Sequence, residues 1–293
     1  MRTAKRAFSI ALVAASLLPG LSAWSANDRE QCEREFAPRS GQAGKDVIWV
    51  PTQEELVMAM LKTANVTSKD YVIDLGSGDG RIPIAAAKHF GAKTLGIEYN
   101  PQMVQLAQCY VRAEGLSDTV QIREADIFKT DFSDATVVTM YLLSDLNLRL
   151  RPTILKLKPG TRVVSNSFDM GDWHADEDIE APNGYSRGYL WIVPAEAKGA
   201  WTFSEEGGDD RFQLQIEQTF QEIDVTVPGN TTASVSNAAL RGADIEFSLS
   251  DQGKQARSFK GKVNDDTIRV STTRGGKTVN YVGRRARGAT TMR

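Results

Sequence analysis

The chain has 293 residues, which is enough for two domains, and its 41% apolar and 25% charged residues are typical of a globular protein. Its formal net charge of −2 gives no bulk attraction to nucleic acid, so we expect no nucleic-acid partner. Two cysteines and two histidines leave little for a zinc site or a Cys–His nucleophile, so we expect no metal. We interpret Cys109 as a small core residue and Cys32 as a free thiol, and a disulfide between them stays open.

The N-terminus has the pattern of a secretory signal peptide. Basic residues precede the apolar run 7–18, and small residues before Ala26 suit a signal peptidase. The run is too short for a stable membrane span. We therefore predict that residues 1–26 direct export to the periplasm or cell envelope, with cleavage after Ser25 or Ala26. An uncleaved anchor is the alternative, and it places the body of the protein outside the cytoplasm as well.

The next segment, residues 27–46, is polar and mixed in charge, and it predicts a linker or a short helix. A brief extended run over 47–52 follows. Thr52, with Glu55 three residues later, has the pattern of an N-cap that opens an amphipathic helix over 53–64.

A strand, a glycine-rich turn and a helix come next, and they are the most informative part of the chain. Residues 71–75 form a buried strand that ends in Asp74 and Leu75, and Gly76, Gly78 and Gly80 follow. Glycines at such a junction let the backbone turn sharply and leave room for a ligand. A helix over 81–90 completes the unit.

The glycine spacing distinguishes between two kinds of ligand. A dinucleotide site requires G-x-G-x-x-G, but here the third glycine comes one position earlier and Asp74 stands two residues before the first. This carboxylate opposes a pyrophosphate and suits a ligand with an ammonium group and a sulfonium. Glu98 follows the loop at the end of a second strand, where a doubly wound sheet meets a ribose. A plain glycine turn in an ordinary α/β domain is the alternative.

Strand and helix patterns continue to alternate up to Pro194. The remaining segments are the strands 93–97, 120–123, 135–141, 162–166 and 186–193 and the helices 102–114 and 146–157. Such βα repeats predict an α/β fold with a doubly wound, Rossmann-like, mostly parallel sheet and a site at the carboxyl ends of its strands. We place this domain at residues 47–196.

After Pro194 the pattern changes to short segments that alternate apolar and polar residues, separated by glycine turns. These segments are 201–203, 212–216, 223–227, 244–249, 258–263, 267–270 and 279–283. They predict a C-terminal antiparallel all-β domain, a small barrel or sandwich, at residues 197–293. It contains no catalytic cluster, so we expect a structural role or the docking of a cell-envelope partner.

Several short motifs together resemble one known enzyme family. They are residues 50–52 (VPT), 74–81 (DLGSGDGR), 141–143 (YLL) with 147–152 (NLRLRP), and 158–165 (KPGTRVVS). They are similar to class I methyltransferases that use S-adenosylmethionine. The resemblance is to the mitochondrial lysine methyltransferases of the ATP synthase c-subunit and of the adenine nucleotide translocase, and to their bacterial relatives. The signal pattern and the β domain are not part of that pattern, so the resemblance implies the cofactor and leaves the acceptor open.

The resemblance implies a cofactor site on the turns that follow the first three strands. Asp74 and the loop would hold the methionine portion, Glu98 would accept hydrogen bonds from both ribose hydroxyls, and Asp126 would contact the adenine amino group. Asp126 as a turn cap, and Pro51 and Thr52 as only a helix start, are the alternatives. The implied cofactor-binding residues are Pro51, Thr52, Asp74, Gly76, Ser77, Gly78, Asp79, Gly80, Glu98, Tyr99, Asn100, Asp126 and Ile127.

The acceptor would lie beyond the fourth strand. Tyr141 is the candidate to orient an acceptor amine, with a core or rim aromatic as the alternative, and Asp169, Asp172 and Trp173 are candidates to line the acceptor pocket. His174 has no recognisable partner and is expected at the surface.

The resemblance implies a protein lysine as acceptor, with a small molecule second. An exported nucleoside-binding protein without turnover is the alternative from a different class, because S-adenosylmethionine is a cytoplasmic metabolite. An NAD(P) oxidoreductase fits the glycine spacing poorly.

Overall fold

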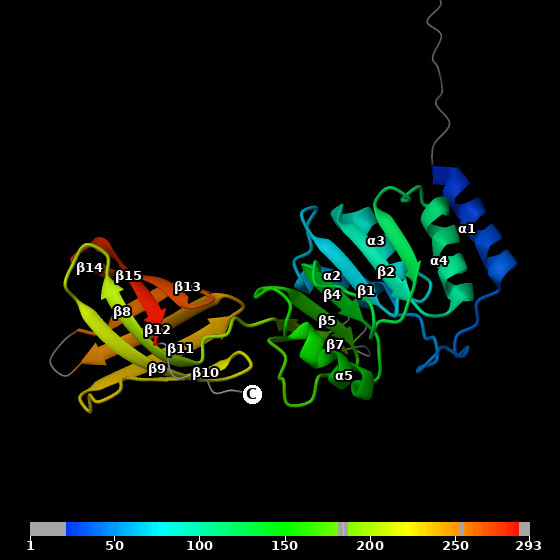
Figure 1. Ribbon diagram of the computed structural model, residues 1–293. Helices are drawn as coiled ribbons and strands as arrows, with labels where there is room; N and C mark the ends of the chain where they lie inside the picture. The colour runs from blue at the N-terminus through cyan, green and yellow to red at the C-terminus, as the bar shows by residue number, and fades with distance from the viewer. Residues whose placement is uncertain (1–21, 181–183, 185–186, 252–254, 287–293) are drawn as a thin grey trace, which may run out of the picture.

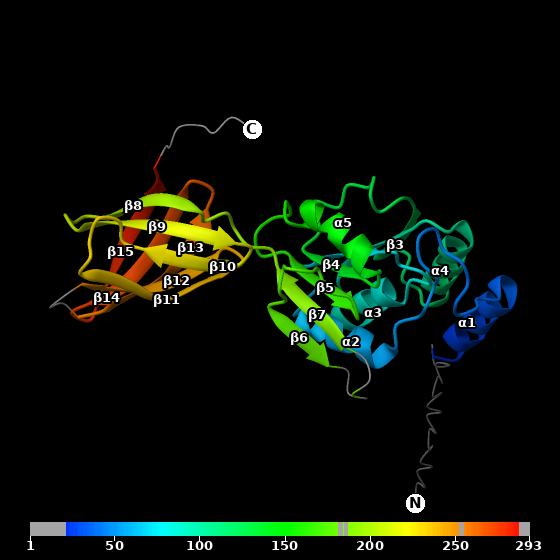
Figure 2. The ribbon, with the colours of Figure 1, turned by 90° about the horizontal axis from the view of Figure 1, so that it is seen from below.

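The computed structural model describes residues 22–180, 184, 187–251 and 255–286. They form an α/β unit followed by an all-β unit, and the two lie side by side (Figures 1 and 2). The predicted signal peptide lies mostly outside the described residues, so its role stays a prediction. Within the described part of the chain, no helix is long and apolar enough to cross a membrane.

The α/β unit is built on a seven-stranded sheet in the order β3-β2-β1-β4-β5-β7-β6. Its first five strands are parallel, while β7 runs antiparallel to β5 and to β6. The predicted doubly wound sheet is confirmed. The strands are β1 (Tyr71–Leu75), β2 (Lys93–Glu98), β3 (Val120–Glu124), β4 (Val137–Met140), β5 (Arg162–Asn166), β6 (Glu177–Glu180) and β7 (Arg187–Ile192). The edge strand β6 was not predicted, because Ile179 is its one buried residue and four residues show no clear period.

Successive strand residues alternate between the two faces of this sheet, so each face has its own core. Val72 and Val137 pack under α2 and α3, whereas Ile73 and Val138 pack on the opposite face with residues of α5. A further cluster joins α4 to α3 and β3. The helices are α2 (Glu54–Thr63), α3 (Arg81–Phe90), α4 (Pro101–Ala113) and α5 (Ser144–Ile154). Burial on both faces explains why the strands read as near-continuous apolar runs.

The second unit is an eight-stranded antiparallel sheet in the order β10-β9-β8-β15-β14-β13-β12-β11. Its end strands β10 and β11 contact each other, so the sheet nearly closes into a barrel. The strands are β8 (Gly199–Glu205), β9 (Arg211–Thr219), β10 (Glu222–Thr226), β11 (Ala233–Arg241), β12 (Asp244–Asp251), β13 (Arg257–Asn264), β14 (Thr267–Arg274) and β15 (Lys277–Arg285). The predicted all-β fold is confirmed. β11 was missed because its burial alternates weakly and its register shifts between Ser236 and Ala239.

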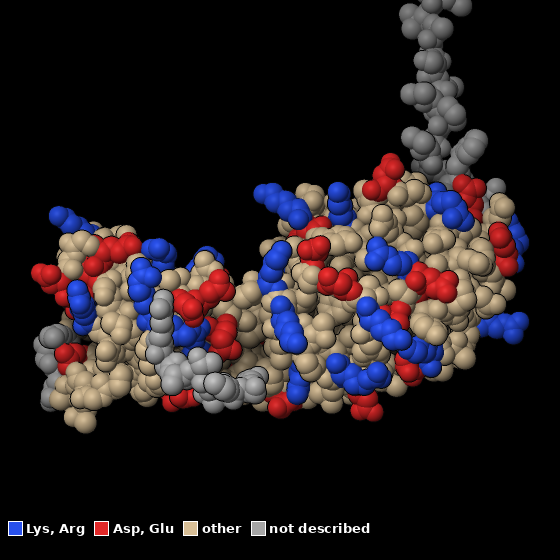
Figure 3. Space-filling view, viewed as in Figure 1, with Lys and Arg blue, Asp and Glu red and all other residues tan. Residues whose placement is uncertain are grey.

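A groove of about 1100 Å³ lies between parts of the two units, with Leu157 and Pro159 of the first and Phe220 and Val263 of the second in its lining. In Figure 3 the surface is hollowed between the two bodies. On the face shown there, basic and acidic side chains are interspersed over both units, in keeping with the small net charge.

The segment predicted as a linker or short helix, residues 27–46, contains most of α1 (Ser22–Phe36), which packs on α4. The interpretation of Cys32 as a free thiol was wrong, because Cys32 forms a disulfide with Cys109 of α4. A single cysteine in a polar helix carries no pairing signal in sequence, so only the packing of α1 on α4 reveals the bond.

Candidate active site

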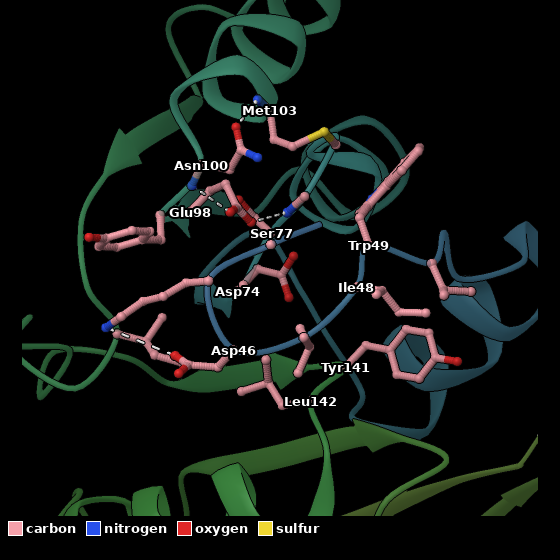
Figure 4. A pocket seen from close by; sticks show the side chains of 18 of the residues that line it. Asp46, Ile48, Trp49, Asp74, Ser77, Glu98, Asn100, Met103, Tyr141 and Leu142 are labelled. Atoms are coloured by element: carbon pink, nitrogen blue, oxygen red, sulfur yellow. Dashed lines mark hydrogen bonds and ion pairs between the residues drawn. The ribbon is translucent and has the colours of Figure 1, made fainter. Parts of the chain in front are cut away.

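A cavity of about 300 Å³ opens at the carboxyl ends of β1, β2 and β4, at the position predicted for the site. Residues 43–52, here called the N-terminal strap, form one wall of it. Figure 4 shows Ile48 and Trp49 of the strap on one side and Glu98 and Asn100 on the other, with Asp74 between them.

The predicted cofactor-binding residues and Tyr141 lie together around this cavity, with the exception of Gly80. Those that line it are Pro51, Thr52, Asp74, Gly76, Ser77, Gly78, Asp79, Glu98, Tyr99, Asn100, Asp126, Ile127 and Tyr141. Gly80 does not line it. It begins α3 with φ 78°, and a Cβ there would stand 3.1 Å from the Ala107 side chain of α4, so this glycine serves close packing of the two helices.

The glycine loop leaves its backbone open toward the cavity. Gly76 and Gly78 have φ values of 79° and 53°, which L-residues with side chains rarely adopt. A Cβ on Gly78 would lie 2.6 Å from Nε1 of Trp49, so the indole packs directly on the loop backbone. Ser77 Oγ is buried there and has no hydrogen-bond partner among the described residues. The loop therefore presents its backbone, and not side-chain bulk, to the cavity.

Asp74 is the buried carboxylate of the site, with 2% of its surface exposed. Its pKa is raised to about 7, chiefly by burial and also by the nearby Glu98 and Asp79, and a 2.6 Å hydrogen bond donated by Thr139 Oγ1 lowers it in part. The Asp74 carboxylate accepts this one hydrogen bond, so its remaining lone pairs can accept hydrogen bonds from a cationic ligand.

Glu98 is held at both oxygens by backbone amides. Gly78 N donates to Oε2 at 2.9 Å and Asn100 N donates to Oε1 at 2.8 Å. Each carboxylate oxygen has a second lone pair, so Glu98 is fixed in orientation and can still accept two hydroxyl donors. Asn100 also caps α4, because its Oδ1 accepts from the Gln102 and Met103 amides.

Asp79 and Thr52 have structural partners that the sequence did not reveal. Arg81 pairs with Asp79 at 2.7 Å and donates to the Thr52 carbonyl at 2.6 Å, which fastens the strap to the glycine loop. The predicted Thr52 capping box is wrong. α2 begins at Glu54, and the Thr52 hydroxyl instead accepts from Asn166 Nδ2 at 3.1 Å.

Lys45 is a site residue that sequence reasoning missed. Its Nζ lies 2.9 Å from Asp126 Oδ2 and 4.7 Å from the centre of the Tyr99 ring. The ion pair raises the pKa of Lys45 and lowers that of Asp126. Asp126 Oδ1 also accepts from the Phe128 amide at 3.0 Å, so the turn-cap alternative holds and only part of this carboxylate remains for an adenine. A lone lysine in a polar segment gives no signal for such a contact.

The opposite end of the cavity is apolar and aromatic. Tyr141 follows β4 and stacks on Phe168 with 6.1 Å between ring centroids, and both line the cavity with Leu142 and Leu143. Phe168, which follows β5, was missed because nothing in the sequence distinguishes it from a core aromatic.

The acceptor-pocket candidates after β5 are wrong. Asp172 is exposed and paired with Arg151, Asp169 accepts from the Gly171 amide, and Trp173 is fully buried. None of the three is in the cavity lining. His174 is at the surface as expected, but it has a partner, Glu222, at 3.4 Å.

An adenosine-bearing sulfonium ligand fits these residues. The open glycine backbone leaves polar groups for the ligand, and Glu98 and Asp74 supply fixed carboxylates for hydroxyl and cationic groups. Within the described part of the chain, no group of three or more metal-ligating side chains is present.

Comparison with known proteins identifies the family to which the α/β unit is similar. The model of the ANTKMT methyltransferase domain family matches residues 74–177. The protein-lysine N-methyltransferase of Saccharolobus islandicus is 42% identical over 151 residues, which cover 50% of this chain and 94% of that protein.

Two further proteins are similar to this chain. The ATP synthase C-subunit lysine N-methyltransferase of Xenopus laevis is 31% identical over 126 residues, 43% of this chain, and the match spans about half of that protein, 54%. A solved structure titled as an RNA methyltransferase from Salinibacter ruber in complex with S-adenosyl-L-homocysteine is 44% identical, with a TM-score of 0.49, covering 50% of this chain and 95% of that one.

Proposed function

The chain belongs to the S-adenosylmethionine-dependent methyltransferases, in the family that contains these lysine methyltransferases, and on this premise we propose that it methylates lysine amines of a protein. The observation that carries the proposal is the placement of Asp74 and Glu98 at the ends of adjacent parallel strands, around one cavity that ends in Tyr141 and Phe168. Polar and aromatic groups thus lie at opposite ends of one pocket.

The cofactor supplies a methyl group on a positively charged sulfur, which is already a good leaving group. The chain therefore has to align the two reactants and exclude water, and it needs no strong acid. Asp74 faces the cationic end of the ligand, and Glu98, held by the Gly78 and Asn100 amides, accepts the ribose hydroxyls without having to reorganise. Trp49 covers the glycine loop from the solvent side.

A lysine acceptor has to lose its proton before it can attack, because its reference pKa is about 10.4. Leu142, Leu143 and Phe168 line the end of the cavity that the acceptor would enter, and an apolar wall disfavours the charged ammonium. Tyr141 lines the same end, and a tyrosine hydroxyl can accept a hydrogen bond from an amine and orient it. This combination supports an amine acceptor over an acidic one.

The test is calorimetry of residues 27–293 against S-adenosylmethionine, S-adenosylhomocysteine and NAD, followed by methyl-labelled cofactor with a protein extract and with total RNA. We expect binding of the first two ligands, none of NAD, and label at lysine in mass spectra of the protein fraction. Label in RNA or in small molecules alone would replace the proposed acceptor, and tight binding with no label anywhere would favour the binding-protein alternative.

Export is a separate part of the proposal. Cys32 and Cys109 are the chain's two cysteines, and they are joined in a disulfide, which is typical of proteins that fold in an oxidising compartment. Together with the signal pattern, this supports a periplasmic or cell-envelope location. The N-terminal sequence of protein from an envelope fraction tests it. A start at residue 26 or 27 is expected, and a cytosolic chain that begins at Met1 would contradict it.

A further inference from the structure

The segment after β5 connects the acceptor end of the cavity with the all-β unit. This segment, residues 167–174, is here called the acceptor loop. Phe168 at its start lines the cavity and stacks on Tyr141. Trp173 near its end is fully buried and lies outside the cavity lining, in contact with the all-β unit.

On the α/β side, α5 holds the start of the acceptor loop. Asn147 Nδ2 donates to the Phe168 and Asp169 carbonyls at 3.0 and 3.1 Å, and Arg151 donates to the Met170 carbonyl at 2.7 Å. Ser165 adds a 2.7 Å bond to the Phe168 carbonyl. These bonds fix the backbone from which the Phe168 ring projects.

The end of the acceptor loop is held by the turn between β9 and β10. Gln221 accepts from Trp173 Nε1 at 2.9 Å and donates to the His174 carbonyl at 2.8 Å. The Phe220 ring stacks on Trp173 with 5.9 Å between centroids, and it packs against the core of the α/β unit rather than against the core of its own unit.

The backbone at Phe220 supports a role for its side chain. Its φ is 54°, in the left-handed region where glycine is free of strain and a bulky residue is not. A phenylalanine in this conformation carries a conformational cost. The contacts of its ring with Trp173 and with the guanidinium of Arg151, 5.4 Å from the ring centre, offset that cost.

We propose that Phe220 and Gln221 are positioning residues through which the all-β unit sets the acceptor wall of the active site. They act on Trp173, the acceptor loop transmits their effect to Phe168, and Phe168 with Tyr141 shapes the entry of the lysine. Cofactor contacts lie on other elements, so the all-β unit governs acceptor use and leaves cofactor affinity unchanged. This inference rests on the proposed methyltransferase function.

The experiment compares Phe220→Ala, Gln221→Ala and Phe220→Tyr in the full mature chain. The matched control is Ile223→Ala, because Ile223 lies two residues after Gln221 and packs on the core of the all-β unit. Hydrogen exchange of residues 166–174, affinity for S-adenosylhomocysteine, and methyl transfer to poly-L-lysine are measured for each variant.

We expect Phe220→Ala and Gln221→Ala to speed exchange in the acceptor loop several-fold and to raise the acceptor KM or lower kcat at least tenfold. The affinity of these two variants for S-adenosylhomocysteine stays within twofold of the parent. Phe220→Tyr keeps the activity that Phe220→Ala loses. Ile223→Ala changes neither loop exchange, nor cofactor affinity, nor methyl transfer. Unchanged loop exchange, the same effect from Ile223→Ala, or a parallel loss of cofactor affinity would overturn the proposal. If the parent chain methylates no acceptor, the proposed function fails, and the exchange data still decide whether Phe220 and Gln221 hold the loop.

Discussion

Glu98 at the end of β2 accepts a hydrogen bond from the amide of Gly78, 2.9 Å away in the loop that follows β1. The carboxylate thus orders the loop as well as facing the cavity. We expect Glu98→Ala to weaken S-adenosylmethionine binding by roughly 1–3 kcal/mol, the usual cost of losing hydrogen bonds to a charged group. Glu98→Gln keeps one acceptor oxygen and should lose less. Calorimetry measures both.

The matched control is Glu124→Ala. Glu124 pairs in register with Glu98 on β3, but it is exposed and does not line the cavity. The Glu124→Ala substitution removes the same charge from the same edge of the sheet as Glu98→Ala. An equal loss of affinity in Glu124→Ala would mean that the overall charge, and not the Glu98 contacts, determines binding.

The fold was predictable where the chain carries a periodic signal. The run from Asp74 to Gly80 sets the strand, turn and helix, and the alternation after Pro194 sets the all-β unit. The site was predictable on the strand ends for the same reason, because parallel strands bring their carboxyl ends to one edge.

The missed features are contacts between segments far apart in sequence. Lys45 and Asp126 are 81 residues apart, and the backbone of Phe168 is held by a hydrogen bond from Asn147 of α5. Trp173 was predicted from sequence to line the acceptor pocket, but it is buried in contact with Gln221 and Phe220 of the all-β unit. Local pattern contains no information on which distant segment packs on which, so these pairs come from tertiary structure alone.

Asp74 should make both the stability of the chain and its cofactor binding depend on pH. Its pKa is raised to about 7 by burial, against about 3.9 in an unfolded chain. Below about pH 4 the Asp74 carboxyl is protonated in both the folded and the unfolded chain, and between about pH 4 and 7 it is protonated only in the folded chain. The free energy of unfolding therefore falls as pH rises through this window and levels off above it. Asp74→Asn should remove this fall and raise the melting temperature at about pH 8.

The same group should couple binding to a proton. A cationic ligand favours the ionised carboxylate, so affinity for S-adenosylmethionine is expected to rise from about pH 6 to 8, with a proton released on binding. Calorimetry in buffers of different ionisation enthalpy measures that proton. Asp74→Asn should bind weakly with no such release. A pH-independent affinity in the parent chain would show that Asp74 is ionised before the ligand arrives.

The Cys32–Cys109 disulfide should support the cavity through the strap. Cys32 is the one fully buried described residue of α1, and residues 37–42 connect this helix to the strap. A bond that closes so long a loop contributes on the order of 2–4 kcal/mol. We expect a reductant to lower the melting temperature and weaken binding of S-adenosylhomocysteine several-fold. A Cys32→Ser, Cys109→Ser chain should match the reduced protein and ignore the reductant. If the reductant changes neither property in the parent chain, Arg29 and its ion pair with Glu114 suffice to hold α1.

Removal of the all-β unit should spare cofactor binding and cost stability. Every residue that lines the cavity precedes Asp169, so a chain of residues 27–196 should bind S-adenosylhomocysteine within a few-fold of the full protein. Trp173 loses the ring of Phe220 and the Gln221 oxygen that its Nε1–H reaches, which should lower the melting temperature. Because the unpaired N–H accounts for part of that loss, Trp173→Phe should be less harmful in the short chain than in the full one. Thermal denaturation of the four proteins gives this comparison directly. A short chain that is insoluble, or folds without binding while the full chain binds, would show that the two units share one core and that the boundary near residue 196 is wrong.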